Sequence, residues 1–188
     1  MSERNTALRT LHDLGLAAWF GGSLMGTIGL NGAAESEGGT DITTARIASA
    51  GWARWVPVNA VAIGAHLIGG TGLLAANSAR VKYQEGVAAS TVAKTALTGA
   101  ALAATAWTRV LGKKVELASS ADPEDQARAA RHPVNLKQAE KHLALAQWTV
   151  PLLTAGLIAL NALHGEQQRP SQQKQGLLQQ AAHFDWHH

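Results

Sequence analysis

Histidine is the residue type in this chain best suited to binding a metal ion or a haem, and two histidines stand at the outer ends of apolar runs. His12, followed by Asp13, precedes the first run, and His164 lies at the end of the last one. If these runs are antiparallel helices, the two imidazoles lie at the same end and at similar depth. Two histidines on neighbouring helices can ligate a haem iron axially, or hold copper or zinc. The alternative is that each ends a helix in polar surroundings and binds nothing.

A second group of histidines stands in the glutamine-rich tail, residues 171–188. Imidazole and carboxylate groups together can chelate a divalent ion. The residues concerned are His183, Asp185, His187 and His188. A flexible terminal cluster of this kind usually binds metal adventitiously, so we predict no resident cofactor, with haem or copper at His12 and His164 as the alternative.

Other polar residues with functional potential lie within the apolar runs. We expect His66 to form a hydrogen bond to a neighbouring helix, and His66 with Asn59 could supply the polar site of a small transporter. Lys94 can extend its amine to the end of its helix. The chain has no cysteine, no glycine-rich phosphate loop, no HExxH and no GxSxG sequence. We therefore predict that the protein is not an enzyme.

The distribution of charge indicates which elements position these residues. The chain of 188 residues has only 15% charged residues, below the roughly 25% typical of soluble proteins. Residues 14–34, 55–79 and 142–165 carry no Asp, Glu, Lys or Arg, and 86–108 carries only Lys94. Because about 20 helical residues cross a hydrocarbon core of about 30 Å, all four runs are long enough to span a bilayer. A soluble alanine-rich bundle is the alternative, but its helices should each show a charged face.

We therefore predict an all-α fold, an integral membrane four-helix bundle. The predicted spans are 11–31, 55–77, 90–108 and 143–164, within a membrane domain 1–170 that precedes the tail. Asp122 and Pro123 predict the start of a short helix that ends near Arg131, before Pro133, in a charged and partly helical loop. Nine positive residues lie in the loops 32–54 and 109–141, against six on the face that carries the two termini, which favours cytoplasmic loops.

Tryptophan and glycine positions predict how such a bundle meets lipid and packs. Tryptophan favours the membrane–water interface, and in the four-span arrangement four tryptophans fall at one interface. They are Trp52, Trp55, Trp107 and Trp148. Close packing of membrane helices depends on small residues, and those predicted to pack are Gly22, Gly26, Gly69, Gly99 and Ala103. These residues either join the four helices to one another or, for the third span, contact a further subunit.

Several segments of the chain resemble a family of small actinobacterial four-span membrane proteins without an established activity. The resemblance covers about residues 10–170 and rests on Trp52–Asn59, Ala62–Gly70, Ala93–Thr98, Gln147–Pro151 and Gly165–Pro170. It implies a multi-pass protein of the plasma membrane, and it provides no catalytic residues. Proteins of similar size serve as accessory subunits of actinobacterial respiratory assemblies. This comparison is an analogy and does not rest on a shared sequence motif.

The sequence thus predicts a non-catalytic accessory or scaffold subunit of a larger membrane complex. A respiratory complex is one candidate for that larger assembly. Its expected partners are the lipid bilayer and other membrane subunits or further copies of itself, and not nucleic acid. The alternatives are a membrane redox protein that binds haem or metal through His12 and His164, and a small transporter.

Overall fold

The computed structural model describes residues 5–76 and 87–167, and all regular structure in these ranges is helical. The all-α prediction is therefore confirmed. The elements are α1 (Thr6–Met25), the π-helical turn η1 (Gly26–Leu30), α2 (Asn31–Gly38), α3 (Asp41–Ala76), α5 (Val87–Ser119), α6 (Pro123–Arg131) and α7 (Leu136–Gln167).

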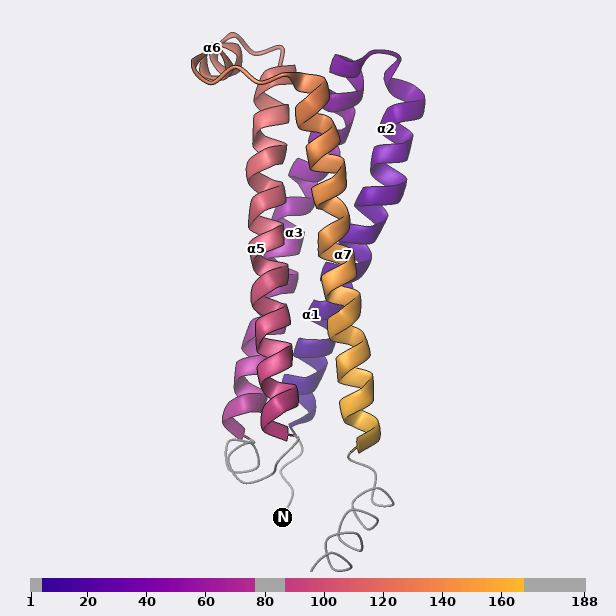
Figure 1. Ribbon diagram of the computed structural model, residues 1–188, viewed down its shortest axis with the longest axis vertical. Coiled ribbons are helices and arrows are strands. Elements are labelled where there is room, and N and C mark those ends of the chain that lie inside the picture. The colour runs from indigo at the N-terminus through magenta and orange to yellow at the C-terminus, as the bar shows by residue number, and fades with distance from the viewer. Residues whose placement is uncertain (1–4, 77–86, 168–188) are drawn as a thin grey trace, which may run out of the picture.

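Long helical rods lie side by side in an up-down-up-down bundle (Figure 1). The segments α1, η1 and α2 form one rod, because the residues at both of their junctions keep right-handed helical dihedral angles. This rod packs against α3 and α7, and α5 packs against α7 and α3. The short helix α6 lies at the end of the bundle where α2 meets α3, opposite the N-terminal end of α1 (Figure 1). We call the end with α6 the α6 end.

The helices are longer than the predicted spans, and they extend mainly at the α6 end. The predicted loop 32–54 is wrong, because α2 and α3 occupy this stretch apart from a turn at Gly39 and Thr40. Gly39 has a φ of 69°, which a side chain would disfavour. The α3 helix has 36 residues and is therefore about 54 Å long, against about 30 Å of hydrocarbon in a bilayer.

The helix predicted between spans 3 and 4 is present as α6. Asp122 caps it, since its side chain accepts a hydrogen bond of 2.8 Å from the Glu124 N–H. Pro123 occupies the first turn, where it needs no hydrogen-bond partner, and the helix ends at Arg131, two residues before Pro133. The α7 helix then begins at Leu136 and continues without interruption through the last apolar run.

The hydrophobic core lies near the middle of the rods and joins all of them. Trp19 of α1 is its centre, with 0% of its surface exposed, and its Nε1–H donates a 3.2 Å hydrogen bond to Thr105 Oγ1 of α5. The buried core residues are Leu16, Trp19, Ala62, Ala101, Val150 and Leu157. The core therefore fixes the separation of the rods at this level.

Glycine allows α1 and α3 to approach closely. A Cβ atom on Gly15 would lie 2.5 Å from the Ala62 carbonyl oxygen, and one on Gly69 would lie 2.5 Å from the His12 amide nitrogen. Gly22 and Gly26 leave room for the rings of Trp55 and Trp52, respectively. Of the predicted packing residues, these three glycines (Gly22, Gly26 and Gly69) lie between α1 and α3.

The other two predicted packing residues, Gly99 and Ala103, lie on the outer face of α5. A Cβ atom on Gly99 would have no neighbour within 4 Å, and both residues are exposed. They do not pack against any other described helix of the chain.

Large apolar side chains cover the outside of the rods below the α6 end. Two helices are long and apolar enough to cross a membrane, namely α3 (Asp41–Ala76) and the Leu136–Leu163 part of α7. Exposed apolar residues nevertheless occur on every rod. They include Leu14, Met25 and Ile28; Val58, Val61 and Ile68; Val92, Trp107 and Val110; and Leu145, Leu152 and Leu163.

The substitution Gly15→Ala tests the close contact of α1 with α3. The added methyl group meets backbone atoms, which cannot rotate away, so we expect the free energy of unfolding to fall by about 1–3 kcal/mol. Thermal unfolding followed by circular dichroism measures the loss. Gly21→Ala is the matched control on the same helix, because nothing lies within 4 Å of its added methyl group. Equal stability of the two variants would contradict the contact.

Candidate functional site: a cavity at the α6 end

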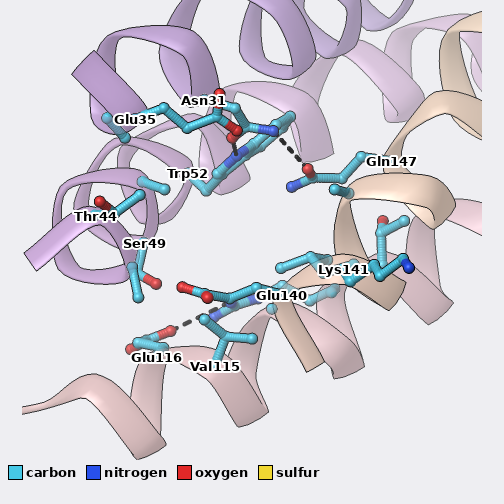
Figure 2. Close-up of a pocket in the computed structure, with 18 of the residues that line it drawn as sticks. Asn31, Glu35, Thr44, Ser49, Trp52, Val115, Glu116, Glu140, Lys141 and Gln147 are labelled. Atoms are coloured by element: carbon cyan, nitrogen blue, oxygen red, sulfur yellow. Dashed lines mark hydrogen bonds and ion pairs between the residues drawn. The ribbon is translucent and has the colours of Figure 1, made fainter. Parts of the chain in front are cut away.

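A cavity of about 570 Å³ lies between the rods at the α6 end (Figure 2). This volume is within the range of small-molecule sites, about 300–1,000 Å³. Small residues on three rods leave the space open, and they include Ala45 and Ala48 of α3, Gly112 of α5 and Ala144 of α7. The core fixes how far apart the rods lie, and their facing side chains are short at this level. The space between the rods is therefore not filled, which leaves the cavity.

The floor of the cavity is formed where the core begins. Ser23, Trp55, Asn59, Thr105 and Val150 line it. Trp55 Nε1 and Asn59 Oδ1, a donor and an acceptor on one helix face, are buried and have no hydrogen-bond partner among the described residues. A buried polar atom without a partner costs about 1–3 kcal/mol, so these two atoms reduce the stability of the fold at this point.

An amide bridge forms one wall of the cavity. Trp52 Nε1–H donates to Asn31 Oδ1 at 2.9 Å, and Asn31 Nδ2–H donates to Gln147 Oε1 at 2.7 Å (Figure 2). These hydrogen bonds connect α3, α2 and α7. Asn31 directly follows the π-helical turn η1, and its N–H bonds back to the Gly26 carbonyl. The extra residue of a π turn rotates the helix that follows, which positions Asn31 for this bridge.

The mouth of the cavity carries charge of both signs. Glu116 of α5 is neutralised by Lys113, at 2.7 Å, and by Arg109, at 3.4 Å. In contrast, three other lining carboxylates come from different segments and form no ion pair within 4 Å among the described residues. They are Glu35 of α2, Asp41 of α3 and Glu140 of α7.

Glu140 has the most perturbed environment of these three carboxylates. It projects from α7 toward the middle of the cavity (Figure 2) and is half-buried. Burial raises the pKa of Glu140 above its ordinary value, and repulsion from Asp41 raises this pKa further. Both causes disfavour its negative charge, and the second one shows that Asp41 lies close enough to Glu140 to repel it.

Neither of the two lysines of α7 that line the mouth forms an ion pair within 4 Å among the described residues. Lys137 and Lys141 are exposed, and the side chain of Lys141 extends away from the cavity (Figure 2). They stand in the first two turns of α7, beside Glu140 in sequence.

The histidines within the bundle form a pair that sequence analysis did not anticipate. The rings of His12 and His66 are in contact at a tilt of 36° with centroids 4.3 Å apart, and His66 Nδ1 lies 3.2 Å from the His12 carbonyl oxygen. The predicted hydrogen bond from His66 to a neighbouring helix is thus present. His12 Nδ1 also contacts Asp13 Oδ1 at 2.9 Å. This pair lies outside the cavity, on the opposite side of the core.

The predicted metal and haem ligands are only partly described. His164 lies in α7, but its side chain is outside the described residues, so its pairing with His12 stays a prediction. The tail cluster His183, Asp185, His187 and His188 also lies outside them. In the described ranges, no three His, Cys, Asp or Glu side chains gather as a metal site would require.

The predicted tryptophan belt requires a correction. Trp107 and Trp148 are 58% and 43% exposed, as an outward-facing pair should be. Trp52 and Trp55 are half-buried instead, with their rings against Gly26 and Gly22, and both line the cavity. They face inward because Gly22 of α1 and Gly26 of η1 provide the space that their rings fill.

Sequence analysis did not identify the cavity itself. A signal was present in the spacing of Trp52, Trp55 and Asn59, since intervals of three and four residues put all three on one helix face. Comparison of the chain with protein-family models, curated proteins and solved structures finds no match.

The environment of Glu140 predicts how stability depends on pH. Because the folded state raises this pKa, the stability contribution of neutral Glu140 is fully present below pH about 4.3 and is lost as pH rises through the folded pKa. Glu140→Gln cannot ionise, so its melting temperature should exceed that of the wild type increasingly from pH 4 to pH 7. The other charged residues that line the same cavity are Glu35, Asp41, Arg109, Glu116, Lys137 and Lys141.

The control for this measurement is Glu37→Gln, which removes one exposed carboxylate of α2 that does not line the cavity. Its melting temperature should follow that of the wild type across the pH range. A pH-independent difference between Glu140→Gln and the wild type would contradict the buried, repelled carboxylate.

Proposed function

We propose that this chain is an integral membrane protein that crosses the bilayer four times, through the central parts of all four rods. The α6 end, with the mouth of the cavity, then projects from the membrane. The apolar character of α3 and α7 supports this proposal. The resemblance described above adds the plasma membrane of an actinobacterium as the proposed location.

The observation that carries the proposal is the apolar surface that the bundle exposes on every rod, in addition to its apolar core. Outside, large apolar side chains are exposed on every rod, and Val61 is 73% exposed. Inside, Ser23, Thr27 and Thr154 are buried. Soluble monomers rarely expose continuous apolar surface, whereas a bilayer stabilises it.

The buried hydroxyl groups suit this environment because each one has a partner within its own helix. Thr27 Oγ1–H donates to the Ser23 carbonyl and Thr154 Oγ1–H to the Val150 carbonyl, both at 2.8 Å. Polar groups in lipid must be satisfied internally, and these bonds achieve it. The other two rods, which contain α1 and α5, both pack against α3 and α7, the two helices that are long and apolar enough to cross a membrane.

Within the membrane, we propose a non-catalytic role as an accessory or scaffold subunit of a larger complex. The outer face of α5 supports this role, because it is exposed and made largely of small residues. These residues are Ala96, Gly99, Ala100 and Ala103. Small side chains allow a neighbouring transmembrane helix to approach closely. The transporter alternative is less well supported, since the core around Trp19 closes the floor of the cavity.

Cysteine labelling tests the four spans, and the absence of native cysteine removes background reactivity. We expect Val61→Cys on α3 and Ala100→Cys on α5 to resist a membrane-impermeant maleimide in lipid vesicles and to react once unfolded in detergent. Ala127→Cys on α6 is exposed and lies outside the predicted spans, so its outward-facing population should react at once. Rapid labelling of Ala100→Cys in intact vesicles would contradict the third span.

The scaffold role is tested by Gly99→Leu, which fills the open space on the outer face of α5. The native mass of the complex extracted from its own membrane should fall to that of the isolated protein, while the melting temperature of the isolated protein stays unchanged. Gly32→Leu is the control, because Gly32 also has nothing within 4 Å but lies on α2. Wild-type protein that is extracted alone would contradict the scaffold role.

A further inference from the structure

We propose that the cavity at the α6 end binds a hydrophobic organic monocation, such as an amine or a quaternary ammonium or phosphonium ion with an apolar body. The cavity of about 570 Å³ is large enough for such a molecule. The inference is independent of the scaffold role, because it concerns the interior of the bundle and not the outer face of α5.

The arrangement of charge selects a cation. Glu35, Asp41 and Glu140 reach the cavity from three segments, and none has an ion-pair partner among the described residues. Asp41 and Glu140 repel each other, so a positive charge placed near both would relieve their repulsion. The remaining acid, Glu116, is already paired with two basic side chains.

The basic residues at the mouth leave this site open to a cation. Arg109 is held by Glu116 at 3.4 Å, and the exposed Lys141 extends away from the cavity (Figure 2). Lys137 is exposed in the first turn of α7, where water screens its charge. Glu35 and Asp41 are exposed and are screened in the same way. Glu140 is half-buried and projects into the chamber (Figure 2), so its charge is the one that water screens least among the three unpaired carboxylates.

The walls select an apolar body for the cation. Trp52 and Trp55 line the chamber together with Val56, Leu143 and Ala48. Indole rings attract cations through their π electrons and also contact apolar groups. A small metal ion or a hydrated inorganic cation would leave this apolar surface uncovered.

The cavity therefore offers carboxylates near its mouth and apolar and aromatic walls at its middle.

Calorimetric titration of the full chain in a non-ionic detergent tests the proposal with tetraphenylphosphonium as the probe. Tetraphenylborate is an anion of nearly the same shape and separates charge selectivity from simple hydrophobic partitioning. We expect saturable binding of one phosphonium ion per chain and no saturable binding of the borate.

Two pairs of variants locate the site. Glu140→Gln should weaken phosphonium binding at least about tenfold, through loss of one nearby charge, whereas Glu37→Gln should not change it. Ala48→Phe fills the chamber and should abolish binding, whereas Ala53→Phe, on the exposed side of the same helix, should not. Melting temperatures establish that each variant is folded, and Glu35→Gln, at an exposed position, replaces Glu140→Gln if the latter does not fold.

Results of the following kinds would overturn the proposal. They are equal binding of the phosphonium and the borate, undiminished phosphonium binding by folded Glu140→Gln or its replacement, and undiminished binding by folded Ala48→Phe. Absence of any saturable phosphonium binding to the wild type would also overturn it.

Discussion

The close packing of α1 on α3 is the contact on which the rest of the bundle depends. Gly15 and Gly69 bring the two backbones together where a methyl group would not fit, and Gly22 and Gly26 admit two indole rings further along. The core around Trp19 then holds this pair of rods against α5 and α7. Above the core the facing side chains become small, so the fixed spacing of the rods leaves a cavity instead of a packed interior.

The proposed membrane location and the proposed cation site arise from different parts of the same rods. The charge-free central segments present apolar surface outward, which suits lipid. The extensions toward α6 carry carboxylates and amides inward, among them Asn31, Glu140 and Gln147. A single long helix such as α3 contributes to both, since its 36 residues exceed the thickness of a bilayer. The outer face of α5 and the inner chamber are thus separate surfaces for separate partners.

Much of the helical architecture could be predicted because its signals are local. The apolar runs predicted the centres of all four rods, and Asp122 with Pro123 predicted the start of α6. The stretch 32–54 was mistaken for a loop because its charged and glycine-rich sequence resembles one, while packing against α3 keeps α2 helical. Trp52 and Trp55 were expected at the membrane–water interface because tryptophan is common there. Their inward orientation depends instead on glycines of another helix, and the spacing of residues along one helix does not reveal such contacts. The cavity depends on the same kind of contact between rods, as does the pairing of His12 with His66.

The central claim is that lipid surrounds all four rods, and spin-label accessibility tests it most directly. A nitroxide would be attached to a single cysteine at Leu14, Val61, Ala100 or Leu152, one exposed position on each rod. In lipid vesicles, all four labels should collide frequently with oxygen, which concentrates in the bilayer, and rarely with a water-soluble nickel complex. Frequent collision with nickel at Leu14 and Ala100, but not at Val61 and Leu152, would contradict four spans and leave only α3 and α7 within the membrane.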